Sequence, residues 1–196
     1  REFITLAPTH RGDPQALWSI LDWGGFLGHC HEDMGQLCLY AYGSDLLIDT
    51  GIYAYAWPLR APFYQTVGHN TVLVDGQTQK RRDPLEAKWV STDQFDVFRG
   101  LTDNSEPLRH ERVVAFRQPG EAGPGYWLCV DLLTGEGKHR LDQRWHTTEK
   151  MKAAADGATV TLTAKPDAGP QAALTLASLP QPDLLTAVVG GEVSYS

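Results

Sequence analysis

Short apolar runs, each closed by a turn residue, recur along most of the chain. They are rich in Val, Leu, Thr and aromatic residues, and Gly, Asp, Asn or Pro follows them. Turn signals such as Gly43-Ser44-Asp45 and Asp75-Gly76 separate neighbouring runs. Many short strands at such spacing are typical of a β-sandwich or a β-barrel. The predicted strands cover residues 36–42, 45–48, 71–74, 94–98, 112–116, 127–133 and 159–163.

Three further segments have a weaker pattern. Residues 1–6 read as a strand. In 13–21, Asp13-Pro14 could cap a helix, but a strand leading into Trp23 is favoured. The stretch 165–182 is rich in Pro, Ala and Asp, and we expect a loop that crosses to a last strand near 192–195. Because it shows neither a repeat nor a linker, the chain is predicted to form a single domain over 1–196.

Charge and cysteine content narrow the classes of function. The formal net charge of -7 argues against a nucleic-acid-binding protein, which normally carries a basic face. It does not exclude an anionic polysaccharide, because a basic cleft can lie on an acidic protein. No apolar stretch reaches transmembrane length, so no membrane partner is predicted. Cys30, Cys38 and Cys129 lack CxxC spacing, and we expect small buried hydrophobic residues rather than disulfides or zinc ligands.

Two histidines separated by one residue are the first candidates for chemistry. They lie in Gly28-His29-Cys30-His31-Glu32-Asp33. If this segment is extended, His29, His31 and Asp33 share one face, because side chains alternate along a strand. Two imidazoles at this spacing can bind one metal ion without bending the backbone. A polar strand face is an equally common explanation of the pattern.

Asp49 and His69 are further candidates at the ends of predicted strands. Asp49 follows the apolar run 46–48, where an unpaired buried carboxylate would be costly, so it needs a cation, a cap or a metal. His69 enters the strand predicted at 71–74. A turn aspartate and a single hydrogen-bonded histidine are the ordinary alternatives. Together with a histidine of the pair, each on a different predicted strand, they would form an N/N/O ligand set suited to tetrahedral zinc.

A group of aromatic residues with one arginine lies between Asp49 and His69. Aromatic rings suit stacking on sugars, and an arginine suits binding of a carboxylate. The same residues equally suit ordinary packing of a loop. The group consists of Tyr53, Tyr55, Trp57, Arg60 and Tyr64.

The order of these motifs resembles the C-terminal half of the heparinase II/III-like polysaccharide lyases. This family includes heparin, heparan sulfate and alginate lyases. The resemblance rests on Gly-His-x-His-x-Asp at 28–33, Asp-x-Gly-x-Tyr at 49–53 and His-Asn-Thr-Val-x-Val-Asp-Gly at 69–76. It continues through 109–114, 126–131 and 143–146, and the His-Asn-Thr-Val segment is its most specific part.

The resemblance implies an antiparallel β-sandwich that accompanies an N-terminal helical toroid in the parent enzyme. It assigns His31, Asp49 and His69 to a structural Zn²⁺ ion, and His29 to the catalytic cleft as a base or charge neutraliser. The reaction would be β-elimination on an acidic polysaccharide or oligosaccharide that contains uronic acid, with most catalytic groups supplied by the toroid. Because this chain lacks the toroid's helices, we expect a fragment, inactive alone, of a periplasmic or secreted protein.

One departure from the family pattern concerns substrate binding. The family often has an arginine just before the Thr that precedes the His-Asn pair, and this chain has Gln65-Thr66 there. Arg60, with Tyr64, is therefore the candidate for binding the substrate. Two alternatives are a non-catalytic carbohydrate-binding or structural domain, and a cupin-like metal oxygenase, whose carboxylate usually follows the His pair more closely than Asp49 does.

Overall fold

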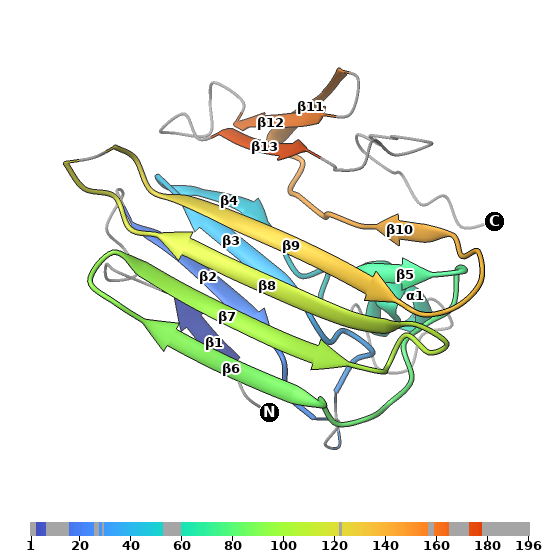
Figure 1. Ribbon diagram of the computed structural model, residues 1–196. Helices are drawn as coiled ribbons and strands as arrows, with labels where there is room; N and C mark the ends of the chain where they lie inside the picture. The colour runs from blue at the N-terminus through green and yellow to red at the C-terminus, as the bar shows by residue number, and fades with distance from the viewer. Residues whose placement is uncertain are drawn as a thin grey trace.

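The computed structural model describes residues 3–6, 16–25, 28, 30–52, 60–121, 123–156, 159–164 and 173–177. They form antiparallel strands joined by turns, with one short α-helix, α1 (Ala61–Tyr64), and one 3-10 helix, η2 (Thr66–Gly68). No helix in this part of the chain is long and apolar enough to cross a membrane. Two larger sheets lie face to face, and smaller sheets lie beside them (Figure 1).

The first large sheet contains, in order, β1 (Phe3–Leu6), β2 (Leu17–Asp22), β3 (Leu37–Ala41) and β4 (Ser44–Leu47). Each strand pairs antiparallel with the next. Alternate residues of β2 and β3 are buried, because one face of the sheet packs on the core. On the opposite face, Trp18 and Tyr40 are partners in the register and stack with ring centroids 5.4 Å apart.

The second large sheet contains, in order, β6 (Glu86–Ser91), β7 (Phe95–Thr102), β8 (Arg109–Arg117) and β9 (Tyr126–Thr134). Its strands are also antiparallel to their neighbours. Burial alternates regularly along β7 and β8, so their inward-facing residues form the second wall of the core.

Two smaller sheets complete the described part of the chain. β5 (Val72–Val74) pairs with β10 (Leu141–Gln143). The other sheet has three strands, β11 (Met151–Asp156), β12 (Thr159–Ala164) and β13 (Ala173–Ala177). Because β5 begins shortly after His69, its pairing with β10 brings a segment distant in sequence next to that candidate ligand.

The hydrophobic core lies between the two large sheets and reaches the β11–β12 hairpin. Trp23 packs on Phe98 with ring centroids 5.3 Å apart, and Phe116 stacks on Trp127 at 4.9 Å. Each fully buried side chain of this kind contributes about 1.5–3 kcal/mol of transfer free energy. The buried cluster comprises Leu17, Leu21, Trp23, Met34, Leu37, Leu39, Ala41, Leu46, Leu47, Phe98, Val114, Phe116, Met151, Val160 and Leu162.

Gly100 lets the indole of Trp23 lie directly against β7. A Cβ atom at position 100 would lie 2.2 Å from a ring carbon of Trp23, closer than real Cβ contacts. Trp23 is buried, and its Nε1–H donates to the backbone oxygen of Glu86 at 3.1 Å. A side chain at position 100 would therefore separate the two sheets at this point.

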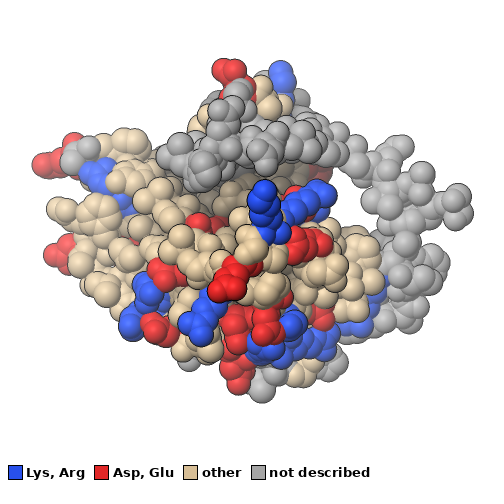
Figure 2. All heavy atoms as spheres, turned by 45° about the vertical axis from the view of Figure 1, so that its right-hand side comes forward, with Lys and Arg blue, Asp and Glu red and all other residues tan. Residues whose placement is uncertain are grey.

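Charged residues of both signs are interspersed on the surface. On the outer face of the second sheet, Arg99 forms ion pairs with Glu86 at 2.9 Å and Glu111 at 2.6 Å. Figure 2 shows the same mixing of acidic and basic residues across one face of the molecule. That face therefore lacks the broad basic surface typical of nucleic-acid-binding proteins.

The pattern of apolar runs predicts most strands of the two large sheets. Every predicted strand from 36–42 to 159–163 overlaps an observed strand, the strand favoured for 13–21 is observed from Leu17 onward, and the sandwich is confirmed. The pattern does not predict β6, β10, β11 or β13. The last lies within 165–182, so the loop expected there is wrong for 173–177. The strand expected near 192–195 lies outside the described residues, and the single domain over 1–196 stays a prediction.

Candidate metal centre

His31 lies in the connection between β2 and β3, shortly before a turn over 33–36. Gly35 has a positive φ of 92°, and the Gln36 N–H donates to the Asp33 oxygen at 2.8 Å, so the segment folds back. Consecutive residues from His31 to Gln36 are all buried, so burial does not alternate as it would along a strand. The described residues of 28–33 form no strand, so the alternating strand face considered for this segment is wrong, and a turn over 33–36 leads from it into β3.

Asp49 and His69 also lie in connections rather than in strands. Asp49 follows β4, and its Oδ1 accepts a hydrogen bond from the Gly51 N–H at 2.6 Å. His69 is the C-terminal cap of η2, and its side chain is fully buried. The expectation that the ligands lie on three different strands is therefore wrong, although Asp49 and His69 each lie close to the end of one.

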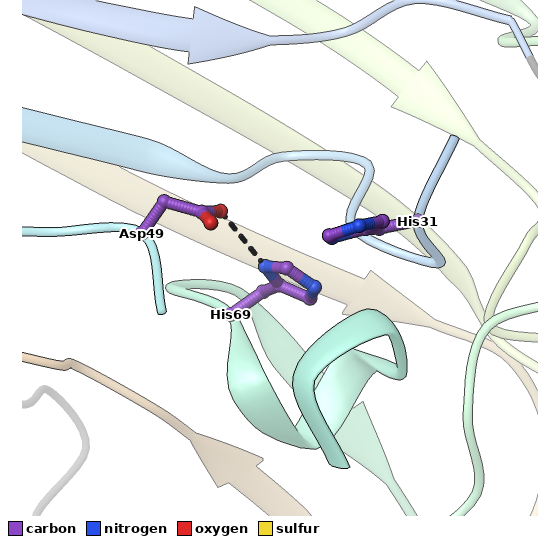
Figure 3. A group of neighbouring side chains, drawn as sticks. All are labelled: His31, Asp49 and His69. Carbon is purple, nitrogen blue, oxygen red and sulfur yellow. Dashed lines mark hydrogen bonds and ion pairs between the residues drawn. The ribbon is translucent and has the colours of Figure 1, made fainter. Parts of the chain in front are cut away.

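The three side chains nevertheless converge. His31, Asp49 and His69 each offer one ligand-type atom, and these atoms lie within 4.8 Å of one another. His69 Nδ1 is 3.1 Å from Asp49 Oδ2, and the two imidazole centroids are 5.2 Å apart. Figure 3 shows the side chains pointing toward one another from three separate connections. The arrangement presents two nitrogens and one oxygen to a common space.

The local electrostatics keep Asp49 ionised. Burial alone raises the pKa of its carboxyl group, but hydrogen bonds from His69 and the Gly51 N–H, with the charges of His69 and His31, lower the pKa overall. Next to the site, burial and the charges of His69 and Arg144 lower the pKa of His146. Because a metal ligand must be deprotonated, an ionised carboxylate and neutral imidazoles are the forms that a cation requires.

A buried ion pair lies behind the turn that follows His31. The Arg112 side chain is fully buried, and it donates to Asp131 through Nε at 2.6 Å and Nη2 at 2.8 Å. His110 Nε2 and Gln143 Nε2 donate to the same carboxylate, both at 2.7 Å. Through Nη1, Arg112 also reaches the backbone oxygens of Gly35 and Asn70. The ion pair therefore joins the second sheet to the segments that carry His31 and His69.

The other candidate residues are only partly within the described chain. His29 and the aromatic residues Tyr53, Tyr55 and Trp57 lie outside it. The Arg60 guanidinium lies over the Tyr64 ring, 5.2 Å from its centroid. The backbone oxygen of Tyr64 accepts a hydrogen bond from the backbone N–H of Glu32 at 2.8 Å. Arg60 and Tyr64 are therefore tied to the connection that carries His31, and their binding of substrate stays a prediction.

A cleft next to η2 contains residues that the motifs alone do not single out as functional. It has a volume of about 330 Å³ and is lined by Gln65, Val67, Leu73, Gly76, Thr78, Arg140, Asp142 and Arg144. The buried Nε of Arg144 has no hydrogen-bond partner in the described part of the chain. Arg144 lies in the sequence motif at 143–146. That motif contributes to the family resemblance, but the resemblance assigns Arg144 no role.

Comparison with known proteins decides the family. The family model for "Heparinase II/III-like, C-terminal" matches residues 20–187. The chain belongs to this family. The resemblance drawn from the His-x-His, Asp-x-Gly and His-Asn-Thr-Val motifs is thereby confirmed.

Relatives of this Heparinase II/III-like chain are much longer proteins. A heparin-sulfate lyase of Pedobacter heparinus is 26% identical over 133 residues, which are 65% of this chain and 19% of that protein. The crystal structure of a mutant of the heparan sulfate lyase HepC from Pedobacter heparinus superposes with a TM-score of 0.72 at 25% identity, covering 82% of this chain and 26% of that one. A heparinase III structure superposes with a TM-score of 0.61 at 14% identity, covering 88% and 32%. The chain therefore spans about a fifth to a third of the relatives it matches.

The three cysteines of the Heparinase II/III-like domain are free and half-buried, rather than fully buried as expected. Burial raises the pKa of the Cys38 thiol to about 11 and that of Cys129 to about 12. Both thiols are therefore protonated and unreactive at neutral pH, because the thiolate is the nucleophile and the metal ligand.

Proposed function

We propose that this chain is the zinc-binding β-sandwich of a polysaccharide lyase. The lyase would cleave a uronic-acid-containing polysaccharide, of alginate or heparinoid type, by β-elimination. The observation that carries the proposal is the convergence of His31, Asp49 and His69 within 4.8 Å in a chain of the Heparinase II/III-like family. The relatives named as heparin-sulfate and heparan sulfate lyases support the heparinoid type.

The three side chains fit zinc by donor type and charge, and one pair of them also fits by spacing. Two imidazoles and one carboxylate form a common zinc ligand set, which a water or substrate oxygen can complete. Two ligands, each about 2.0–2.1 Å from one tetrahedral ion, lie about 3.3 Å from each other. The 3.1 Å between His69 Nδ1 and Asp49 Oδ2 is close to this spacing. When bound, zinc would supply a divalent charge that joins three connections of the sandwich.

His29 is the residue of this chain that we assign to catalysis. β-Elimination requires removal of the C5 proton of the uronate, neutralisation of its carboxylate and protonation of the departing C4 oxygen. His29 would assist as a base or as a neutralising group, and His31, fixed in the zinc site, would hold it in position. The helical toroid of the parent protein would supply the remaining groups.

Arg144 is the residue that we assign to binding of a substrate carboxylate or sulfate in the cleft beside η2. A guanidinium matches the geometry of such oxyanions. Its buried Nε has no hydrogen-bond partner among the described residues, whereas Arg140 on the same cleft donates to Asp142 at 2.9 Å. Arg60 and Tyr64 would contact the sugar from the other side of η2.

The proposal includes an acidic polysaccharide or oligosaccharide as the partner, together with the toroid of the parent chain. Charges of both signs are mixed on the face of Figure 2, so an acidic polymer would be bound there by local groups rather than by a broad basic field. A periplasmic or secreted location, which the family resemblance implies, belongs to the same proposal.

The test combines a lyase assay with metal analysis of the protein at its natural length. Incubation with alginate, heparan sulfate and heparin should release an unsaturated uronate, detected by its ultraviolet absorbance, and the purified protein should contain one zinc per chain. Binding of these polymers without any unsaturated product would instead identify a non-catalytic carbohydrate-binding domain. Iron or manganese with consumption of oxygen would identify the cupin-like alternative. Either result would refute the lyase proposal.

A further inference from the structure

Asn70, which directly follows His69, is fully buried and connects the segments that carry the three candidate ligands. Its Nδ2 donates to the Leu37 oxygen at 2.8 Å and to the Ile48 oxygen at 2.9 Å. Leu37 begins β3, directly after the turn that follows His31, and Ile48 is the residue before Asp49. An amide group has two N–H donors, so both are used to link these two segments to His69.

The remaining polar atoms of Asn70 are also paired. Its Oδ1 accepts a hydrogen bond from the His146 backbone N–H at 2.6 Å and lies 3.2 Å from His146 Nδ1. Its backbone N–H donates to Gln36 Oε1, and its backbone oxygen accepts from Arg112 Nη1 at 2.7 Å. The same guanidinium reaches the Gly35 oxygen. Among the described residues, Asn70 therefore contacts the segment after His31, the residue before Asp49 and the segment at His146.

We infer that Asn70 is the positioning residue of the proposed zinc site and fixes the separation of His31, Asp49 and His69. The inference rests on the proposed zinc site. None of the three ligands lies in a strand, so strand pairing alone does not set their spacing. The Asn70 side chain joins the backbone next to Asp49 and the backbone after the turn that follows His31. Groups that orient metal ligands in this way control metal affinity, and their loss typically weakens it by about 10–100-fold.

The variant Asn70→Asp tests this role with little change in shape. It replaces the NH₂ group by an oxygen that would face the carbonyl oxygens of Leu37 and Ile48, so two attractive contacts become repulsive. Zinc affinity, measured by competition with a chromophoric chelator, should fall by about 10–100-fold. The visible absorption spectrum of the protein loaded with Co²⁺ should also change, because it reports the arrangement of the ligands.

Two further variants separate positioning from general stability. Ser19→Ala removes a partly buried hydrogen bond, from Trp127 Nε1 at 3.1 Å, that does not involve the ligand-bearing segments. It should lower the melting temperature and leave zinc affinity and the Co²⁺ spectrum unchanged. Gln36→Leu removes the acceptor of the Asn70 N–H and a long contact from Gln36 Nε2 to Cys38 Sγ at 3.5 Å, but it keeps both side-chain donors of Asn70. It should therefore weaken zinc binding less than Asn70→Asp does, and it tests the positioning role if Asn70→Asp does not fold.

The outcomes distinguish this inference from the zinc proposal on which it rests. If the unmodified protein binds no zinc, both are overturned. If it binds zinc, and the foldable variants at positions 70 and 36 bind zinc equally tightly with an unchanged Co²⁺ spectrum, only the positioning role is overturned. Lower zinc affinity and an altered spectrum in these variants, with neither change in Ser19→Ala, support it.

Discussion

Breaking the buried ion pair of Arg112 and Asp131 on one side should strongly destabilise the fold at neutral pH, and this cost should shrink at low pH. Four hydrogen bonds converge on the Asp131 carboxylate, two on each oxygen. Asp131→Asn replaces one oxygen by an NH₂ group, which faces two donors, and it leaves the buried guanidinium without a negative partner. Breaking a buried pair on one side costs about 3–5 kcal/mol. In a domain of this size the melting temperature should fall by roughly 6–20 °C.

The stability difference between the unmodified protein and Asp131→Asn should depend on pH, because it follows the ionisation of Asp131. Burial raises this pKa, but the charge and hydrogen bonds of Arg112 and the hydrogen bond of His110 outweigh burial and hold it well below its usual value. The folded protein therefore binds the proton more weakly than the unfolded chain. The stabilisation is fully present above about pH 3.9, the pKa of an aspartate in the unfolded chain. It is lost as the pH falls through the lower pKa that Asp131 has in the folded protein.

The assay is chemical unfolding followed by tryptophan fluorescence, carried out from neutral to acid pH on the unmodified protein and on Asp131→Asn. The difference in unfolding free energy should be constant near neutral pH and should shrink below about pH 4. Glu106→Gln is the control, because Glu106 forms exposed ion pairs with Lys80 and Arg82 and its loss should have little effect. A difference that is small at neutral pH, or that persists unchanged into acid, would contradict the reasoning.

Three further predictions concern the candidate site in the protein at its natural length. Removal of zinc with a strong chelator should lower the melting temperature, and added zinc should restore it; an unchanged melting temperature would show that the ion is not structural. His31→Ala should lose zinc first and stability with it, whereas His29→Ala should keep both and reduce turnover by about 10²-fold; the opposite zinc contents would show that the two roles are exchanged. Arg144→Gln should raise KM for the acidic polymer with zinc content unchanged, and Arg144→Lys should do so less; an equal KM in all three proteins would exclude Arg144 from substrate binding.

The strands that the sequence predicts contain short runs of apolar and aromatic residues. The runs that predict β3, β7 and β8 include buried core residues such as Leu37, Phe98 and Phe116. β6 is an edge strand whose residues are mostly exposed, and the Ala-rich β11 has no apolar alternation, so neither gives this signal. Edge and peripheral strands are defined by their neighbours rather than by their own sequence.

The site was predictable in its residues but not in its architecture. The family motifs singled out His31, Asp49 and His69, and the structure brings them together. The His-x-His spacing favours a strand, whereas the positive φ of Gly35 and the burial of consecutive residues produce a turn. Asn70 and Arg112 stabilise that turn through contacts across 34 and 77 positions of sequence, which no local pattern reports.

The contact between Trp23 and Gly100 also acts against mispaired arrangements of the second sheet. A slip of β7 by one residue would turn Arg99 or Leu101 toward the core, because adjacent side chains face opposite sides. A slip by two residues would restore the correct face, but it would place Phe98 or Thr102 against the indole. Each of these carries the Cβ atom for which there is no space at that point. One missing side chain therefore restricts β7 to a single register, and it does so without adding any attractive contact.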